Sequence, residues 1–351
     1  MATCFYRRLS HAVAIAFAAG VFTASPASAE VTYKVLSYDD LDGWAEDDHS
    51  AALSVFQDTC QDMRDSDWKT LCAYATQQPD ARAFFELLFR PVLIEDGNDA
   101  LFTGYFEPEL DGSRVQTPRY RYPVYAMPPE ARRIRPWLTR RDILSTNVMD
   151  GRGLEIAWVD DSVELFFLQI QGSGRIRLPD GNYIRVGYAG ANGHLYRSIG
   201  GELVRRNVYK PHQVSAQVIK NWVRRNPVEG LELLFHNNSY VFFRNVDQVP
   251  ADKGPLGAMN RSITTMRSVA VDPKFVKLGS PVWLEKDGKM PLRQLMMAQD
   301  TGGAIKGAQR ADVFFGTGDK AGRAAGRLRD SGRMMVLMPI QRAFALLPED
   351  A

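Results

Sequence analysis

The 351-residue chain is poor in the residues on which metal and nucleophile chemistry usually depends. It contains three Cys and five His, and no His pair has the His-Glu-x-x-His spacing of zinc hydrolases. The glycines around Ser173 (Gly172-Ser173-Gly174) lack the spacing of a hydrolase nucleophile elbow. No Gly-Lys-Ser/Thr sequence is present to form a phosphate-binding loop. We therefore expect no metal and no cofactor, and a chemistry that depends on carboxylates.

The chain also lacks a large net charge. Its formal charge is +2, and the first 29 residues hold two arginines and no acidic residue, so the remaining chain is neutral. A neutral chain without a Lys/Arg stripe has no electrostatic surface for nucleic acid. Beyond the N-terminal region, no segment is long and apolar enough to cross a bilayer. These absences exclude nucleic-acid binding and a transmembrane anchor from the expected functions.

The N-terminus has the pattern of a secretory signal peptide. Arg7-Arg8 precede an apolar core at His11–Thr23, and Ala27-Ser28-Ala29 is a small-residue cleavage site. The mature chain is therefore expected to begin at Glu30. The nearby Cys4 precedes the apolar core, so no lipid-acceptor Cys stands at the cleavage point. The pattern predicts a soluble periplasmic protein and leaves association with the outer membrane open.

Cys60 and Cys72 are the two cysteines of the predicted mature chain, and they are expected to form a disulfide. Each lies on an apolar stripe of helical spacing, six residues from Ser66 in a predicted turn. In a helical hairpin the two thiols could meet, and export favours oxidation. Closing this loop would contribute roughly 3 kcal/mol. The alternative is two buried free thiols; a zinc site is incomplete without His ligands.

Hydrophobic periodicity divides the chain into helical and strand-rich parts. About 320 mature residues exceed what one core usually organises, so two domains are expected. Residues from about 48 to 90 have helical spacing, and further helices are predicted near 195–206, 215–225 and 320–329. Pro179-Asp180-Gly181 predicts a hairpin turn. Short strands are predicted at 101–106, 122–127, 163–171, 240–244, 268–271, 281–285, 295–299, 313–315 and 334–338. Many short strands with glycine turns indicate a β-barrel rather than a parallel βαβ sheet.

Two aspartates enclose the most informative segment. Asp300 begins Asp-Thr-Gly-Gly-Ala-Ile-Lys-Gly, and Asp312 follows twelve residues later, before the apolar Val313–Phe315. The glycine-rich turn could bring the strand ends together, so that both carboxyls share one cleft. Apolar surroundings raise the pKa of a carboxyl and let it hold a proton, as a general acid must. The alternative is that both residues only cap turns. With no other catalytic group evident, carboxylates among amide, hydroxyl and aromatic groups suit a carbohydrate substrate.

Four motifs resemble the membrane-bound lytic murein transglycosylase A family. They are Asp300-x-Gly-Gly-Ala-Ile-Lys-Gly with Asp312, Phe102-Thr-Gly-Tyr-Phe-Glu-Pro, Leu168-Gln-Ile-Gln-Gly-Ser-Gly-Arg and Gly254-Pro-Leu-Gly-Ala. The resemblance covers roughly residues 101–339. It implies a mainly β fold with some α: a double-psi β-barrel domain, an inserted second β-rich domain, and a glycan groove between them. The implied divisions are 30–107 (helical N-terminal part of the barrel domain), 108–236 (insert) and 237–351 (catalytic part of the barrel).

The resemblance also implies a reaction and a set of site residues. Asp312 would be acid and then base in cleaving the β-1,4 bond between N-acetylmuramic acid and N-acetylglucosamine, with Asp300 as its companion. The muramyl C6 hydroxyl would attack C1 and form 1,6-anhydromuramic acid. An attacking group within the substrate removes the need for a second catalytic carboxylate. The candidate sugar contacts are Thr103, Tyr105, Gln171, Ser173 and Lys306.

Two other functions remain open on the sequence. An inverting glycoside hydrolase would use Asp312 as acid and Asp300 as base on water. A non-catalytic peptidoglycan-binding protein would keep the groove without turnover, although the presence of both aspartates weighs against it. In each case the expected partner is a peptidoglycan glycan strand. The protein is expected to be a monomer, and contacts with other proteins of cell-wall synthesis or remodelling are left open.

Overall fold

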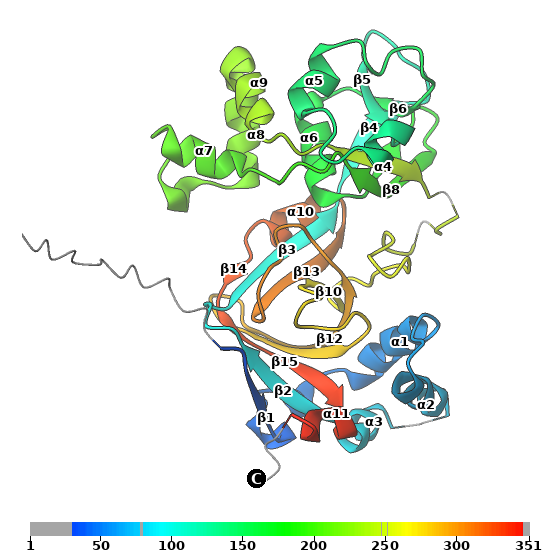
Figure 1. Cartoon of the computed structure of the whole chain (residues 1–351), viewed down its shortest axis with the longest axis vertical. Helices are drawn as coiled ribbons and strands as arrows, with labels where there is room; N and C mark the ends of the chain where they lie inside the picture. The colour runs from blue at the N-terminus through cyan, green and yellow to red at the C-terminus, as the bar shows by residue number, and fades with distance from the viewer. Residues whose placement is uncertain (1–29, 78–79, 247, 251, 347–351) are drawn as a thin grey trace, which may run out of the picture.

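The computed structural model describes residues 30–77, 80–246, 248–250 and 252–346. The predicted signal peptide lies outside the described residues. The strands form two sheets, which occupy the lower and upper parts of the molecule in Figure 1. The lower part is built from both ends of the described chain, and the upper part from the segment between them.

The lower sheet has nine strands in the order β1-β2-β15-β11-β12-β10-β13-β3-β14. Neighbours are antiparallel except for two parallel pairs, β10 with β12 and β13 with β3. The second pair joins segments about 200 residues apart in the sequence, and it places Thr103 directly opposite Asp312. The strands are β1 (Thr32–Val35), β2 (Phe89–Glu95), β3 (Leu101–Glu107), β10 (Ser268–Val271), β11 (Pro281–Lys286), β12 (Leu292–Asp300), β13 (Arg310–Thr317), β14 (Arg329–Asp330) and β15 (Gly332–Pro339).

Alternation along the first residues of β13 separates a core face from the face that carries Arg310 and Asp312. Ala311 and Val313 are fully buried in an aliphatic core shared with Val269 and Val271 of β10. Successive strand side chains point to opposite faces, so Asp312 lies on the face away from this core. Burying one such aliphatic side chain stabilises the fold by roughly 1.5–3 kcal/mol. The apolar residues around Asp312 therefore fix its strand in place while its carboxyl faces outward.

Three helices pack against the nine-stranded sheet on a different side from the aliphatic core that contains Ala311 and Val313. They are α1 (His49–Cys60), α2 (Ser66–Ala75) and α3 (Ala81–Leu88), within the range expected from periodicity. Phe56 of α1 and Trp68 of α2 are almost completely buried in a second, aromatic-rich core. A disulfide joins Cys60 to Cys72, with a Cα–Cα distance of 5.4 Å. The lower part also contains α10 (Gly318–Ala325) and α11 (Ile340–Phe344).

The upper sheet has six strands in the order β5-β6-β4-β7-β8-β9. The hairpin predicted at Pro179–Gly181 is confirmed, because β7 and β8 pair antiparallel on either side of it. The strands are β4 (Glu109–Ser113), β5 (Tyr122–Tyr125), β6 (Glu155–Val159), β7 (Gly174–Arg177), β8 (Tyr183–Ala191) and β9 (Val241–Asn245). The helices of this part are α4 (Pro129–Arg133), α5 (Arg140–Ser145), α6 (Ser162–Gln171), α7 (Ile199–Arg205), α8 (Ala216–Arg225) and α9 (Pro227–His236).

One predicted strand is wrong: residues 163–171 form helix α6. Asp161 caps its N-terminus by accepting hydrogen bonds from the N–H groups of Val163 (2.7 Å) and Glu164 (3.2 Å). Gly172, with φ 79°, ends it in the left-handed conformation. The five consecutive residues Leu165–Gln169 are buried. A helix buried on most sides shows no polar stripe, so periodicity could not separate it from a buried strand.

The boundaries of the parts also differ from the predicted ones. Strand β9 pairs with β8 in the upper sheet, so the upper part extends beyond the predicted boundary at residue 236. The predicted helical segment 30–107 contains strands β1, β2 and β3 in addition to its helices. Helix α9 was not predicted; it begins at Pro227, a residue that suits the first position of a helix.

A buried ionic cluster joins the two parts where β3 leaves the lower sheet. The Glu107 carboxylate is fully buried and receives hydrogen bonds from Arg175 Nε (3.0 Å) and Thr317 Oγ1 (2.7 Å). Arg185 Nε lies 3.0 Å from its other oxygen. Removing one partner would leave an uncompensated buried charge, which typically costs about 3–5 kcal/mol, so a substitution of Glu107 alone should destabilise the connection between the sheets. No helix among the described residues has both the length and the apolar character needed to span a membrane.

Candidate active site

Asp300 and Asp312 lie opposite the same residue of the nine-stranded sheet. Ala270 of β10 pairs with Asp300 on one side and with Asp312 on the other. Two inter-strand spacings separate their backbones, about 10 Å. The glycine-rich segment therefore does not join β12 and β13 as adjacent strands, because β10 lies between them. The two aspartates nevertheless share one rung of the sheet.

Asp312 is held through only one of its two carboxyl oxygens. Thr103 Oγ1 donates a hydrogen bond of 2.6 Å to Asp312 Oδ1. Arg310 Nη2 in turn donates to Thr103 Oγ1 at 2.8 Å. Burial raises the pKa of Asp312, and the Thr103 hydrogen bond and the Arg310 charge oppose that rise without cancelling it. Among the described residues no hydrogen bond reaches Oδ2, so this oxygen is available to an incoming ligand.

Asp300 has both oxygens occupied by donors. Oδ1 accepts hydrogen bonds from the N–H groups of Ala258 (3.0 Å) and Thr301 (2.9 Å). Oδ2 accepts one from the Tyr105 hydroxyl at 2.9 Å. Burial raises the pKa of Asp300 to about 6, although these three donors lower it; the nearby Asp312 charge adds a small further rise. A raised pKa therefore does not distinguish the two carboxyls, whereas their hydrogen bonds do.

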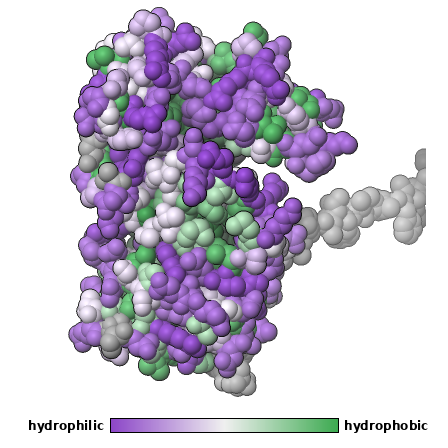
Figure 2. All heavy atoms as spheres, turned by 180° about the vertical axis from the view of Figure 1, so that it is seen from behind, coloured by the Kyte–Doolittle hydropathy of each residue, from purple (hydrophilic) through white to green (hydrophobic). Residues whose placement is uncertain are grey.

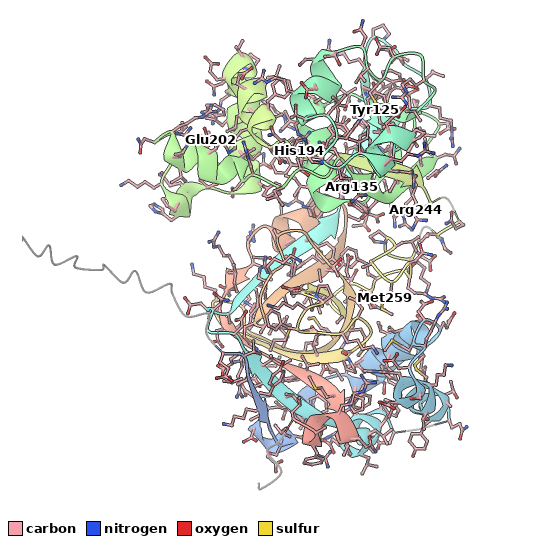
Figure 3. The ribbon with its side chains drawn as sticks, in the orientation of Figure 1. Tyr125, Arg135, His194, Glu202, Arg244 and Met259 are labelled. Atoms are coloured by element: carbon pink, nitrogen blue, oxygen red, sulfur yellow. A yellow bond between two sulfur atoms is a disulfide. The ribbon has the colours of Figure 1, made fainter. Side chains whose placement is uncertain are left out.

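The loop over Asp300 depends on a glycine. A Cβ on Gly257 would lie 2.7 Å from the carbonyl oxygen of Gln299 and 3.5 Å from Asp300 Cβ. Without a side chain, the loop approaches closely enough for the next residue, Ala258, to donate its N–H to Asp300. The same loop reaches the upper part, where Arg244 Nη2 donates to Asn260 Oδ1 at 2.6 Å. Figure 3 labels Arg244 in the upper part of the molecule and the loop residue Met259 below it.

The predicted sugar contacts lie at different distances from the two acids. Thr103 and Tyr105 of β3 contact Asp312 and Asp300 directly. Gln171 Oε1 accepts a hydrogen bond of 3.2 Å from the N–H of Phe106, so it lies at the junction of the two parts beside β3. Ser173 follows α6 at the same junction, and none of the hydrogen bonds to the two acids among the described residues comes from it.

Lys306 lies apart from the two acids. Its Nζ is 3.9 Å from Asp272 Oδ1, and its side chain is 63% exposed. Within the described part of the chain it makes no ion pair or hydrogen bond with Asp300 or Asp312. The structure therefore brings Thr103 and Tyr105 to the acids, sets Gln171 and Ser173 at the junction, and leaves Lys306 on the far end of the loop.

Sequence reasoning missed Arg310 and the main-chain N–H of Ala258. For Arg310 a signal was present, because it stands two residues before Asp312, and residues i and i+2 of a strand share a face. For Ala258 the signal was the Gly254-Pro-Leu-Gly-Ala motif that contains it, but the motif did not show that this loop folds over the sheet and donates to Asp300.

Asp300 and Asp312 line neither of two cavities in the structure. One of about 600 Å³ lies beside Tyr38, Trp44 and Phe344; another of about 440 Å³ lies beside Met127 and Tyr188. From behind, Figure 2 shows a less hydrophilic band across the middle of the molecule, between more hydrophilic upper and lower parts. No group of three His, Cys, Asp or Glu side chains suited to a metal ion occurs in the segments that the structure describes.

Comparison with known proteins finds similarity to one family of proteins. Residues 101–244 match the family described as "MltA specific insert domain", and residues 267–338 match the "3D domain". The "Membrane-bound lytic murein transglycosylase A" of Vibrio cholerae is 34% identical over 270 residues, covering 73% of this chain and 70% of that protein.

Solved structures give the same result. The crystal structure of MltA from Neisseria gonorrhoeae is similar with a TM-score of 0.76 and 34% identity, covering 88% of this chain and 93% of that one. E. coli MltA with bound chitohexaose is similar with a TM-score of 0.71 and 26% identity, covering 88% of this chain and 94% of that one.

Proposed function

The chain belongs to the membrane-bound lytic murein transglycosylase A family, and from that premise we propose that Asp312 is its single catalytic acid and base. The enzyme is a peptidoglycan lytic transglycosylase. It cleaves the β-1,4 bond between N-acetylmuramic acid and N-acetylglucosamine and forms 1,6-anhydromuramic acid. The residue roles below are our proposals for how this chain carries out that reaction.

One observation carries the choice of Asp312 over Asp300. Asp312 has a free Oδ2, whereas both oxygens of Asp300 accept hydrogen bonds from protein donors. A general acid must present its proton to the substrate within hydrogen-bond reach. Each oxygen of Asp300 already accepts at least one hydrogen bond from the protein, whereas Oδ2 of Asp312 accepts none among the described residues. Asp312 can therefore present a proton to the substrate from an oxygen that no protein donor occupies.

The reaction then needs one carboxyl. Oδ2–H of Asp312 donates its proton to the glycosidic oxygen, and the C1–O bond breaks as positive charge develops at C1. The C6 hydroxyl of the same muramyl residue attacks C1 and gives its proton to the Asp312 carboxylate. The acid is thus regenerated and no water is consumed. Because the attacking group is part of the substrate, its high effective molarity raises the reaction rate. Proton transfer by a positioned group raises the rate by a further factor of about 10²–10⁴.

Asp300 acts as a fixed charge rather than as a proton carrier. With a pKa of about 6 it is mostly ionised at neutral pH. A negative carboxylate on the same rung as Asp312 would stabilise the positive charge that develops at C1, as fixed charges do in preorganised sites. Tyr105 remains a donor to Asp300, because burial and the two neighbouring acids raise its own pKa.

We further infer that the nine-stranded sheet closes as a double-psi β-barrel and that the six-stranded sheet is an inserted domain. Support comes from the two parallel pairs, which interleave strands from distant parts of the chain, and from the match of residues 101–244 to an insert family. The glycan strand would lie between the two parts, beside β3. In the E. coli relative, the bound ligand is chitohexaose. We propose Gln171 and Ser173 as contacts to the strand from the upper part, and Lys306 as a more distant contact.

The relatives are named as membrane-bound, and for this chain we propose a periplasmic enzyme released after residue 29. The small-residue cleavage site and the absence of a Cys at that site support this proposal. N-terminal sequencing of the protein purified from cells should begin at Glu30. A lipid-modified residue or an uncleaved Met1 would contradict the assignment.

The test of the activity is the mass of the product. Purified enzyme is incubated with cell-wall sacculi, and the muramyl-terminated products are weighed. An anhydro end, lighter than a reducing end by one water, supports the lytic reaction; a reducing end would instead indicate the hydrolase, which activates water. Asp312→Asn should lose turnover and still bind glycan. Asp319→Asn, at an exposed Asp of α10, is the matched control and should retain turnover.

A further inference from the structure

Arg310 is fixed by three hydrogen bonds beside the proposed acid. Nη1 donates to the carbonyl oxygens of Leu101 (3.1 Å) and Ala311 (2.6 Å). Nη2 donates to Thr103 Oγ1 (2.8 Å). The two carbonyl contacts belong to β3 and β13, so the guanidinium is anchored to the same two strands that carry Thr103 and Asp312. Its orientation is therefore set by main chain rather than by a mobile side chain.

While Asp312 is ionised, the hydrogen bonds from Arg310 through Thr103 to Asp312 can run in only one direction. A guanidinium carries donors and no acceptor, so Arg310 must donate to the Thr103 oxygen. The hydroxyl has one proton, and the partner in reach is Asp312 Oδ1 at 2.6 Å. Donation from a cation polarises the hydroxyl, which makes it a stronger donor and a weaker acceptor. Asp312 Oδ1 is accordingly held as an acceptor.

We propose that Arg310 is a positioning residue that acts through the Thr103 hydroxyl to keep the transferable proton of Asp312 on Oδ2. The inference rests on the proposed role of Asp312 as the acid. A neutral carboxyl can carry its proton on either oxygen. On Oδ1 the proton would be hydrogen-bonded to Thr103 and could not be transferred to the glycosidic oxygen. On Oδ2 it faces the unoccupied side, where the substrate binds.

The same hydrogen bonds from Arg310 through Thr103 to Asp312 also act in the second half of the reaction. After Asp312 has given its proton away, Thr103 and the Arg310 charge stabilise the carboxylate through Oδ1. The returning proton from the C6 hydroxyl then meets Oδ2, which is the only oxygen without a donor. The proton leaves and returns at one atom, so the acid is reset without a rearrangement of the side chain.

Charged and titratable groups from four strands surround Asp312. Arg310 shares its strand, Asp300 ends β12, Tyr105 lies on β3, and Arg329 of β14 pairs in register with Thr103. Asp300 is the acid whose charge acts on this group of residues, and burial raises its pKa to about 6. Arg310 differs from Arg329 in lying in the hydrogen-bonded chain to Asp312, so its removal changes both a charge and a proton position.

The experiment compares three substitutions on solubilised glycan. Arg310→Gln removes both the positive charge and the planar guanidinium, and Arg310→Lys keeps the charge but not the planar arrangement of N–H donors. Thr103→Val removes the hydroxyl. Each should lower kcat by about 10- to 100-fold, the range for one hydrogen bond to a charged group, with little change in KM. Thr103→Ser keeps the hydroxyl and should retain most of kcat. Lys289→Gln, which removes a charge from the exposed β11–β12 turn, is the matched control and should behave as wild type.

Two readouts separate positioning from a general structural role. The Arg310 charge lowers the pKa of Asp312, so Arg310→Gln should move the basic limb of the pH profile to higher pH, while Arg310→Lys should leave it near its wild-type position. The double variant Arg310→Gln/Thr103→Val should be no slower than the slower single variant, because both act in one chain.

The inference is overturned by losses that multiply in the double variant, by an unmoved basic limb in Arg310→Gln, or by effects confined to KM. Melting temperatures of all variants show whether any loss is a folding defect, and Thr103→Ser and Arg310→Lys keep the test decisive if the larger changes unfold the protein. Asp312→Asn is measured alongside. If it stays active, the proposed acid is wrong; if it is inactive while the Arg310 tests fail, only the positioning role is wrong.

Discussion

Replacing Asp300 by Asn should remove a pH-dependent loss of stability from the folded protein. Burial raises the pKa of Asp300 from 3.8 to about 6. Because the folded-state pKa lies above the unfolded value, the folded state binds more protons than the unfolded state between about pH 4 and pH 6. Stability is therefore highest below this window and falls as the pH rises through it. A shift of about 2 pKa units corresponds to about 3 kcal/mol.

The assay is urea unfolding of wild type and Asp300→Asn at several pH values from about 3.5 to 7.5. Relative to wild type, the variant should gain about 3 kcal/mol in free energy of unfolding between the ends of this range. Titration of Asp312 is common to both proteins, and its charge is the smallest of the effects on the pKa of Asp300. Asp319→Asn, which changes an exposed carboxyl of α10, is the control for an Asp→Asn change away from the site. Parallel curves for wild type and Asp300→Asn would refute the reasoning.

Three further predictions follow from the site and its support. Asp312→Asn should reduce turnover by about 10⁴-fold or more, because one residue serves both proton transfers, and Asp300→Asn should reduce it less; equal losses in a turnover assay would favour a two-carboxylate mechanism. Gly257→Ala should lower both kcat and the melting temperature, because the new Cβ would lie 2.7 Å from the Gln299 carbonyl oxygen and from Ile263 Cγ2 and push the Ala258 N–H away from Asp300; wild-type turnover would contradict this. Cys60→Ser/Cys72→Ser should lose about 3 kcal/mol of unfolding free energy, with no further loss on adding reductant; reductant that leaves the wild type unchanged would argue against the disulfide.

Local features of the fold could be predicted from the sequence where a short stretch decides the structure. The β7–β8 hairpin follows from Pro179-Asp180-Gly181, and the proximity of Cys60 and Cys72 follows from two apolar stripes around one turn. Strand β13 contains the apolar run Val313–Phe315 that predicted a strand, although it begins at Arg310 and so includes Asp312. In each case the residues that determine the structure lie within about fifteen positions of one another, so a single window contains the information.

Features that depend on distant pairing could not be predicted in this way. Nothing near Asp312 shows that β13 pairs with β3, and that pairing supplies Thr103. The placement of β10 between the two aspartates is likewise set by register across the whole sheet. Helix α6 was mistaken for a strand because burial on most sides removes the polar stripe that would reveal its period.

The position of each aspartate along its strand explains why two similar carboxyls have different environments. Asp312 lies in the middle of β13, between β10 and β3, where the neighbouring main-chain N–H groups are used by the sheet. Only side chains can donate to it, and Thr103 reaches one oxygen. Asp300 is the last residue of β12, where the ladder ends and the N–H groups of Thr301 and the Ala258 loop are free to donate. The strand interior therefore leaves Asp312 with one carboxyl oxygen that no protein donor reaches among the described residues. At the strand end both oxygens of Asp300 accept hydrogen bonds, which suits a carboxylate that acts as a fixed charge.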